Sequence, residues 1–318
     1  LSHQRGVSCR SLHLDRLPRK IMSERLIKCP LCKSGNILNH SLVKDYAVSQ
    51  KEFTLCRCGD CELLFTNPRP KEEEIGPYYD FKEYYSHEDK VQNFTQWVYQ
   101  KIRNYSIRKK VDLIFGLSKG GSLLDYGCGT GEFLQEAQRQ KWTVRGIEPS
   151  EKARGQALRK LPNQIVPTLN ELPEEESYDV VTLFHVLEHI HSLRKTLKSI
   201  VNHLKTGGYL LIAVPNPHSE DAKHYGSTWA GYDVPRHLYH FSQKSMAVIQ
   251  DEFALDLVET KPMIFDSYYV SLLSEGYKNP TRGLISRYWK ASLQGYRSNK
   301  KAGVPGNYSS NIFIFKKK

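Results

Sequence analysis

The chain has 318 residues, of which 39% are hydrophobic and 25% are charged, and its formal net charge is +12. These values suit a globular protein with one α/β domain and a smaller module, and we expect no membrane span because no apolar run reaches about 18 residues. Residues 1–28 carry a net charge of +5 and residues 278–318 carry +10, which leaves −3 for residues 29–277. Because a nucleic-acid enzyme more often carries its positive charge around the active cleft, this distribution disfavours a polyanionic substrate.

Residues 1–28 form a basic, irregular leader without an apolar core long enough for a secretory signal. They fit either a transit-like segment or an extension ahead of a native start at Met22. We favour the second interpretation, in which residues 1–21 are not native, because Leu1 is no initiator and the first motif begins at Cys29.

The seven cysteines indicate a metal site rather than disulfides, because their number is odd and most of them lie in one short segment. Two C-x-x-C units with 25 residues between them have zinc-ribbon spacing and supply four candidate ligands: Cys29, Cys32, Cys58 and Cys61. Cys56 competes with Cys58, which we favour because it repeats the C-x-x-C spacing. We therefore predict a zinc-ribbon-like module at residues 29–66, with structural zinc supplying much of its folding energy, and a reducing, cytoplasmic location.

A helical connector is predicted at residues 67–118. Its first part contains tyrosine pairs at 78–79 and 84–85, and apolar residues recur at helical spacing over residues 91–115. Simple packing of these tyrosines against the connecting helix is one explanation of their presence.

The segment 123–134 predicts a short strand, a tight turn and a helix. Three glycines at alternate positions let the backbone turn sharply and approach a ligand closely: Gly127, Gly129 and Gly131. Asp125 ends the strand, where doubly wound sheets bind ligands. Glu148 follows 23 residues later, at the end of a second strand, where a carboxylate can accept hydrogen bonds from both ribose hydroxyls of an adenosine. A dinucleotide pattern would need glycine at position 132, which is occupied by Glu132.

This pattern resembles the glycine-rich motif of class I S-adenosylmethionine-dependent methyltransferases. Zinc-ribbon-fused bacterial members of this group carry segments similar to residues 63–85. The resemblance implies an α/β fold with a doubly wound, Rossmann-like seven-stranded sheet and an N-terminal zinc ribbon. It implies that these residues bind the cofactor at the turn and the second strand: Asp125, Gly127, Cys128, Gly129, Gly131 and Glu148. It further implies contacts from Leu169 near the adenine ring, from Phe184 and His185 at a later strand end, and from Tyr85, with Tyr79 beside it, at the methionine end.

Strands and helices alternate from residue 122 to residue 214, which predicts a parallel, right-handed sheet. Buried strands are predicted at 178–184 and 209–214, and segments 257–260 and 311–315 fit the antiparallel pair that ends the sheet of the resembled group. The methyltransferase domain is thus predicted at residues 119–318. Its insertions at 216–242 and 266–310 are predicted to face the substrate, the first as a lid dense in polar and aromatic groups.

Methyl transfer requires alignment of the reacting atoms and, for a hydroxyl acceptor, a base. His185 is the first candidate for this base and His237 the second, because histidine titrates near neutrality. His189 is assigned a structural role. Some quinone O-methyltransferases bind a divalent metal at a similar motif. Glu188 and His189 match that motif, but His185 stands where an acid would be, so no magnesium is predicted. Cys128 is not taken as a nucleophile, since the resembled group presents only backbone there.

The leading interpretation is therefore transfer of a methyl group from S-adenosylmethionine to a small-molecule acceptor, such as a sugar, a lipid-linked saccharide or a secondary metabolite. Two alternatives remain open. One is an RNA methyltransferase that grips its substrate with the zinc ribbon and the basic tail, and the other is a non-catalytic zinc-dependent scaffold that keeps the cofactor fold. Binding that weakens steeply with salt would favour RNA.

Overall fold

A seven-stranded mixed sheet forms the centre of the computed structural model, which describes residues 23–79, 94–303 and 306–318. Its strand order is β12-β13-β10-β9-β6-β7-β8. The strands are β6 (Ser122–Tyr126), β7 (Thr143–Ile147), β8 (Ile165–Val166), β9 (Tyr178–Phe184), β10 (Leu204–Pro215), β12 (Leu255–Pro262) and β13 (Ser310–Lys317). Neighbours from β10 to β8 run parallel, whereas β13 is antiparallel to both β10 and β12. The predicted Rossmann-like seven-stranded α/β sheet is confirmed.

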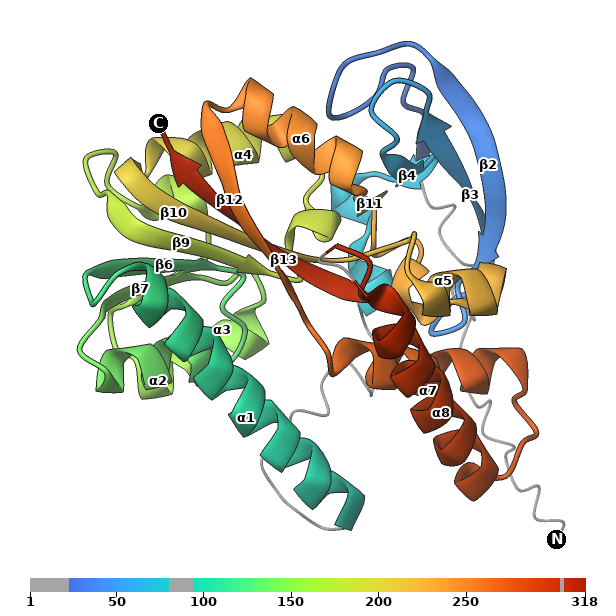
Figure 1. Ribbon diagram of the computed structural model, residues 1–318. Helices are drawn as coiled ribbons and strands as arrows, with labels where there is room; N and C mark the ends of the chain where they lie inside the picture. The colour runs from blue at the N-terminus through green and yellow to red at the C-terminus, as the bar shows by residue number, and fades with distance from the viewer. Residues whose placement is uncertain (1–22, 80–93, 304–305) are drawn as a thin grey trace, which may run out of the picture.

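Helices cover both faces of this sheet because its central strands are apolar on both sides. On one face lie α1 (Phe94–Leu117), α2 (Glu132–Arg139) and α3 (Glu151–Lys160), and on the other lie α4 (Leu193–Asn202) and α6 (Gln243–Glu252) (Figure 1). Two apolar cores separate the sheet from these two helical layers. The carboxyl ends of the parallel strands therefore remain as the place where loops can build a site.

The cysteine-bearing segment forms a second, four-stranded sheet in the order β11-β4-β3-β2. Its strands are β2 (Ile37–Lys44), β3 (Glu52–Cys58), β4 (Leu64–Thr66) and β11 (Tyr239–His240). The outermost strand, β11, comes from the middle of the predicted methyltransferase domain and pairs with β4. Residues of the cysteine segment also share an apolar core with β9, β10 and α6. Two short strands, β1 (Ser23–Glu24) and β5 (Arg69–Pro70), pair beside it.

The segment 216–242 was expected to form a substrate-facing lid, but its aromatic residues are buried in the protein core. It contains α5 (Glu220–Tyr225) and short 3₁₀ turns at Gly226–Thr228 and Ala230–Tyr232. Trp229 and Tyr232 are 1% and 8% exposed and pack with residues of β2, β3 and β4 in a third apolar cluster. The lid prediction is wrong for these side chains because the pairing of β11 with β4 draws the segment into the core.

The segment 266–310 contributes a helical pair between β12 and β13. It consists of α7 (Asp266–Lys278) and α8 (Leu284–Ala302), which lie beyond the edge of the central sheet in Figure 1. Further short 3₁₀ turns are formed by Glu72–Glu74, Gly76–Tyr79, Leu169–Glu171 and Leu187–His189. Among the described residues, no helix combines the length and apolarity that crossing a bilayer requires.

Candidate active site

The glycine turn joins β6 to α2 at the carboxyl ends of the parallel strands. Gly127, Gly129 and Gly131 have φ angles of 79°, 56° and 83°, in the left-handed region that favours glycine. A Cβ on Gly127 would lie 2.4 Å from Cγ2 of Val186, which follows β9. The turn and the loop after β9 are therefore packed directly against each other at the edge of the sheet where α/β folds bind their ligands.

Glu148 follows β7, and its carboxylate lies against the glycine turn. One carboxylate oxygen accepts the Gly129 backbone N–H at 2.8 Å, and the other accepts the Ser150 N–H at 2.8 Å. Burial raises the pKa of Glu148, although these two hydrogen bonds oppose the change. An acceptor pair next to a glycine turn fits the ribose of S-adenosylmethionine, so the residues present suit this cofactor.

Asp125 is 5% exposed at the end of β6 and accepts a hydrogen bond from the Thr182 hydroxyl at 2.6 Å. Burial raises the pKa of Asp125 to about 7, although the Thr182 hydrogen bond and the positive charge of Lys110 act in the opposite direction. A positively charged ligand beside Asp125 would favour the ionised carboxylate. The negative charge of that carboxylate would in turn suit a cationic sulfonium compound.

His185 lies directly after β9 between two carboxylates. Its φ angle of 59° is left-handed, and its N–H donates to the Ala213 carbonyl at 2.9 Å. The imidazole Nε2 lies 3.0 Å from Asp266, and Nδ1 lies 3.5 Å from the buried Glu188. Burial by itself lowers the pKa of His185, but the two carboxylates outweigh it and raise the pKa to about 9. The two carboxylates therefore favour the protonated form of His185, whereas the sequence suggested a histidine that titrates near neutrality.

Comparison with protein families identifies the chain. A family model described as a methyltransferase domain matches residues 99–260, about half of the chain. The chain belongs to this methyltransferase family. Together with the seven-stranded sheet and the glycine turn, the family supports S-adenosylmethionine as the methyl donor and a class I methyltransferase architecture.

Curated relatives of this methyltransferase are named ubiquinone biosynthesis O-methyltransferases. That of Rickettsia typhi is 24% identical over 180 residues, covering 52% of this chain and 72% of the relative. The mitochondrial protein of Candida albicans is 32% identical over 106 residues, which cover 30% of this chain and only 32% of the relative. Among solved structures, the StiE O-methyltransferase domain has 19% identity and a TM-score of 0.47, covering 71% of this chain and 78% of that one. A methyltransferase from Thermotoga maritima has 18% identity and a TM-score of 0.45, covering 71% and 98%.

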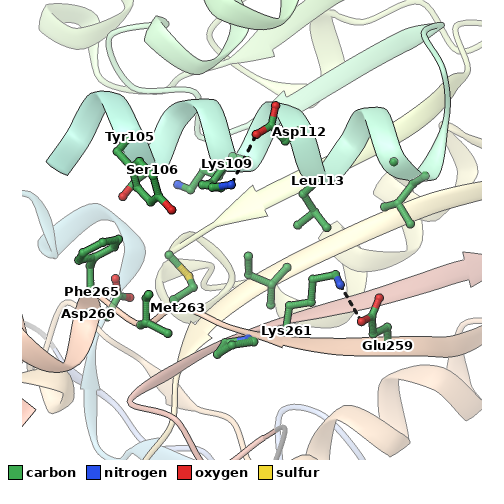
Figure 2. A pocket seen from close by; sticks show the side chains of 16 residues that line it. Tyr105, Ser106, Lys109, Asp112, Leu113, Glu259, Lys261, Met263, Phe265 and Asp266 are labelled. Carbon is green, nitrogen blue, oxygen red and sulfur yellow. Dashed lines mark hydrogen bonds and ion pairs between the residues drawn. The ribbon is translucent and has the colours of Figure 1, made fainter. Parts of the chain in front are cut away.

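A cavity of about 580 Å³ lies between α1, β12 and the start of α7 (Figure 2). Aliphatic and aromatic side chains line much of it, and the ring of Tyr105 meets Phe265 edge to face with centroids 5.6 Å apart. The polar groups on its wall include Asp266, whose carboxylate lies 3.0 Å from Nε2 of His185. The ion pair Lys109–Asp112 lies on the α1 side of the cavity, and Lys261–Glu259 lies on the facing β12 side. The cavity therefore ends at a carboxylate–histidine pair of the methyltransferase.

Phe184 and Lys110 connect this cavity to the end of β6. The Lys110 Nζ lies 4.1 Å from the centroid of the Phe184 ring, which also packs edge to face against Phe133. Burial lowers the pKa of Lys110, while the charges of Asp125 and Asp266 act to raise it. Lys110 therefore links the carboxylate near the glycine turn with the carboxylate at the cavity.

A second polar cluster contains Glu188 and the histidines of the 3₁₀ turn and of segment 216–242. Ligand atoms of Glu188, His189 and His237 lie within 4.8 Å of one another, which is a spacing that could hold a metal ion. His237 Nδ1 lies 2.9 Å from the Gly231 carbonyl, to which it can donate. Burial lowers the pKa of His189 to about 4, consistent with the structural role expected for it. His240 is 2% exposed and extends this histidine cluster.

The other predicted cofactor residues fall into three groups. Cys128 is buried in the turn, and burial raises the pKa of its thiol, which opposes a nucleophilic role. Leu169 is partly buried in the 3₁₀ turn after β8. Tyr85 lies outside the described residues, whereas the Tyr79 hydroxyl lies 3.0 Å from His189 Nδ1.

The four predicted zinc ligands come together, whereas Cys56 does not join them. The Sγ atoms of Cys29 and Cys61 are 3.5 Å apart, as are those of Cys32 and Cys58, and all four sulfurs lie within 4.8 Å of one another. Zinc–sulfur bonds of about 2.3 Å in a tetrahedron place the sulfurs about 3.8 Å apart, so the donor set fits zinc. Cys56 instead lies 3.7 Å from the side-chain oxygen of Asn39 and forms part of the shared core.

Sequence reasoning missed two residues of this site, Asp266 and Lys110. Asp266 was placed only at the border of an insertion, and Lys110 only within the connecting helix. Neither belongs to a motif, and Asp266 follows His185 by more than one complete strand–helix unit. No local signal in the sequence identifies either residue, because only the packing of α1 and α7 against the strand ends brings them to Phe184 and His185.

Proposed function

We propose that the protein transfers the methyl group of S-adenosylmethionine to a hydroxyl group of an apolar, ring-containing small molecule that binds in the cavity between α1 and β12. The observation that carries this proposal is the cavity wall: aliphatic and aromatic side chains surround the Asp266 carboxylate, which is paired with His185. The names of the curated relatives support an oxygen acceptor. A sugar, one of the acceptors expected from the sequence, fits this apolar lining less well.

The donor site would be built by Asp125, the glycine turn and Glu148. When bound, S-adenosylmethionine supplies an electrophilic methyl group. Glu148 would accept from the ribose hydroxyls in place of its present contact with the Gly129 N–H. Asp125 would contribute negative charge, and Phe184 would close the wall between the donor site and the cavity. As the family resemblance implies, Leu169 would lie near the adenine ring of the cofactor and Tyr85 at its methionine end.

Asp266 would contact the acceptor hydroxyl, and His185 would hold the proton that leaves it. Both ring nitrogens of His185 face carboxylates, at 3.0 Å and 3.5 Å, so we assign the direct contact with the acceptor to Asp266, which lines the cavity. The hydroxyl O–H bond would break as the oxygen attacks the methyl carbon, and the proton would pass through Asp266 to a neutral His185. His237 remains the second candidate for the base, but it belongs to the cluster around Glu188.

We further propose a structural zinc bound by Cys29, Cys32, Cys58 and Cys61. Such a site requires reduced thiols and would fit a cytoplasmic location. The division into a leader (1–28), a zinc module (29–66), a connector (67–118) and a methyltransferase domain (119–318) stays a proposal. The alternative of an RNA substrate has less support, because residues 29–277 carry a net charge of −3. The alternative of a non-catalytic scaffold has less support because it leaves the His185–Asp266 pair without a role.

Replacement of His185 by asparagine tests the role in proton transfer. We expect kcat to fall by about 100-fold or more, since a general base contributes on that order, while the Kd for S-adenosylmethionine changes little. In the unmodified enzyme, kcat/KM should rise with pH through a midpoint near pH 9 and level off above it, because the base must be neutral and the pKa of His185 is about 9. Asp266→Asn removes a carboxylate that raises this pKa, so the midpoint of the rise should move to lower pH.

Glu259→Gln is a matched control for Asp266→Asn, because Glu259 also lines the cavity but pairs with Lys261 rather than with His185. A pH profile that is identical in the unmodified enzyme and in Asp266→Asn would contradict the assignment of His185. Unchanged turnover in His185→Asn would move the base role to His237 or remove it altogether.

Filling the cavity tests where the acceptor binds. Leu113→Trp places a larger side chain in the wall opposite β12, and we expect it to raise the KM for the acceptor by about tenfold or more while leaving donor binding unchanged. Leu257→Trp, at a residue of β12 that is 38% exposed, adds the same side chain outside the cavity lining and should have no such effect. Equal KM values in both variants would place the acceptor elsewhere.

A further inference from the structure

Helix α8 has an inverted distribution of side chains. Small or polar residues form its buried face: Ala291, Gln294, Gly295, Ser298 and Ala302. The facing helix α7 likewise buries Ser267, Ser271 and Ser274. A Cβ on Gly295 would lie 2.7 Å from the Tyr268 ring and 2.9 Å from its Cα, so the two helices approach closely. This close packing leaves no room between the helices for the large side chains of α8.

The large apolar side chains of α8 consequently point to solvent. Their exposed fractions are Leu284 65%, Ile285 88%, Tyr288 46%, Trp289 72%, Leu293 38% and Tyr296 55%. Ile285, Trp289 and Leu293 recur every four residues and so form one stripe along the helix. We call these six residues the α8 stripe. Scattered exposed apolar residues are common, but a continuous stripe that includes tryptophan marks an interaction surface.

Basic residues accompany the α8 stripe without any acidic counterpart in that part of the sequence. Lys290, Arg297 and Lys300 are exposed on the same helix. From residue 276 to the end, the sequence contains ten lysines and arginines and no aspartate or glutamate. Lys301 is paired with Glu220 of α5, at 2.5 Å, so part of the charge is balanced from outside this segment. The helix therefore presents an apolar stripe next to a cationic one.

We propose that the α8 stripe is a docking surface for an anionic lipid membrane, on which α8 lies in the plane of the interface. Exposed tryptophan, tyrosine and aliphatic side chains would enter the boundary between headgroups and acyl chains, while the lysines and arginines contact anionic headgroups. This combination of apolar, aromatic and basic side chains is typical of helices that lie in the membrane interface. The proposal is independent of the acceptor and of the base assigned above.

Charge and chemistry favour a membrane over other occupants of this surface. A second copy of the chain would bring two cationic helices face to face, and like charges there oppose association. A nucleic acid would use the basic residues but would leave Ile285, Trp289 and Leu293 without apolar partners, since its surface offers mainly phosphates and sugars. An anionic bilayer offers apolar partners to the α8 stripe and negatively charged partners to the basic residues of the same helix.

Vesicle binding of the full-length protein tests the proposal. We expect sedimentation with vesicles of phosphatidylcholine containing about one third phosphatidylglycerol, and weak binding to phosphatidylcholine alone. Ile285→Glu/Trp289→Glu should abolish the binding. Lys290→Gln/Lys300→Gln should weaken it by about tenfold or more, and high salt should weaken it in the unmodified protein.

The controls make the same changes of charge at exposed positions elsewhere on the surface. Leu42→Glu/Val258→Glu introduces the same two carboxylates at residues that are 59% and 53% exposed on β2 and β12. Lys195→Gln/Lys198→Gln removes two exposed lysines from α4. Both controls should bind vesicles normally. Vesicle binding that is equal in all variants, or absent from the unmodified protein, would overturn the proposal. So would a dimer that dissociates in Ile285→Glu/Trp289→Glu without any vesicle binding. Circular dichroism and donor binding of each variant would verify that its fold is intact.

Discussion

Replacing Glu148 with alanine is expected to weaken the binding of S-adenosylmethionine by at least about 100-fold, because two hydrogen bonds to a charged acceptor are lost and each contributes about 1.5–3 kcal/mol. The physical basis is the position of the carboxylate. It already accepts the N–H of Gly129 at 2.8 Å, next to the glycine turn, and can exchange that contact for the ribose hydroxyls. Calorimetric titration with S-adenosylmethionine and S-adenosylhomocysteine would measure the loss.

Glu151→Ala is the matched control for this experiment, because Glu151 is an exposed carboxylate three residues further along, in the first turn of α3. Its affinity for both compounds should remain within about twofold of the unmodified protein, because an exposed charge contributes little. Near-normal affinity in Glu148→Ala would show that the donor does not bind at this strand end. The proposed roles of Asp125 and the glycine turn would then fall with it.

Replacing Cys61 with serine is expected to remove zinc and to unfold the sheet formed by β2, β3 and β4. A structural zinc site supplies folding free energy directly, on the order of 10 kcal/mol in small zinc modules, and one lost thiolate leaves an incomplete tetrahedron. The loss of structure should extend to the active site, because β4 pairs with β11 (Tyr239–His240). This strand begins two residues after His237, the second candidate for the base. Metal analysis should find about one zinc per chain in the unmodified protein and none in the variant.

Cys56→Ser separates the loss of zinc from the loss of any buried thiol in this module. Cys56 is as buried as Cys61, at 3% and 2% exposure, but its sulfur lies near Asn39 and does not belong to the four-sulfur cluster. We expect this variant to keep its zinc and to lose only modest stability. Zinc that is retained in Cys61→Ser, or absent from the unmodified protein, would contradict the proposed metal site.

The active site also explains how one partly buried histidine can favour its charged form. His185 gives up hydration on burial, which favours the neutral ring, but Asp266 and Glu188 favour the cation more strongly. The pKa of Glu188 correspondingly falls to about 2: burial opposes this, and the hydrogen bond from His185 and the nearby histidines outweigh burial. The charge on His185 therefore stabilises the fold fully below its unfolded pKa of about 6.5, and this contribution is lost as the pH rises through about 9.

Local sequence determined the proposed donor site of this protein, because its parts lie at fixed positions along the chain. Gly127, Gly129 and Gly131 are required by the tight turn itself, and Glu148 ends the next strand, so both were predicted without tertiary information. The same holds for the cysteines, since two C-x-x-C knuckles can be recognised from spacing. The order of strands and helices also predicted the parallel part of the sheet, and the resemblance to class I methyltransferases implied its seven strands and the antiparallel pair at its edge.

Tertiary structure alone decided the cavity, the charge of His185 and the position of segment 216–242. Asp266 meets His185 only because α7 packs at the strand ends, and the contact then moves the pKa of the histidine away from neutrality. Trp229 and Tyr232 looked like lid residues, yet the pairing of β11 with β4 buries them. The outward stripe of α8 likewise follows from its close contact with α7. Contacts between distant segments set burial and charge, and a local pattern of residues cannot specify those two quantities.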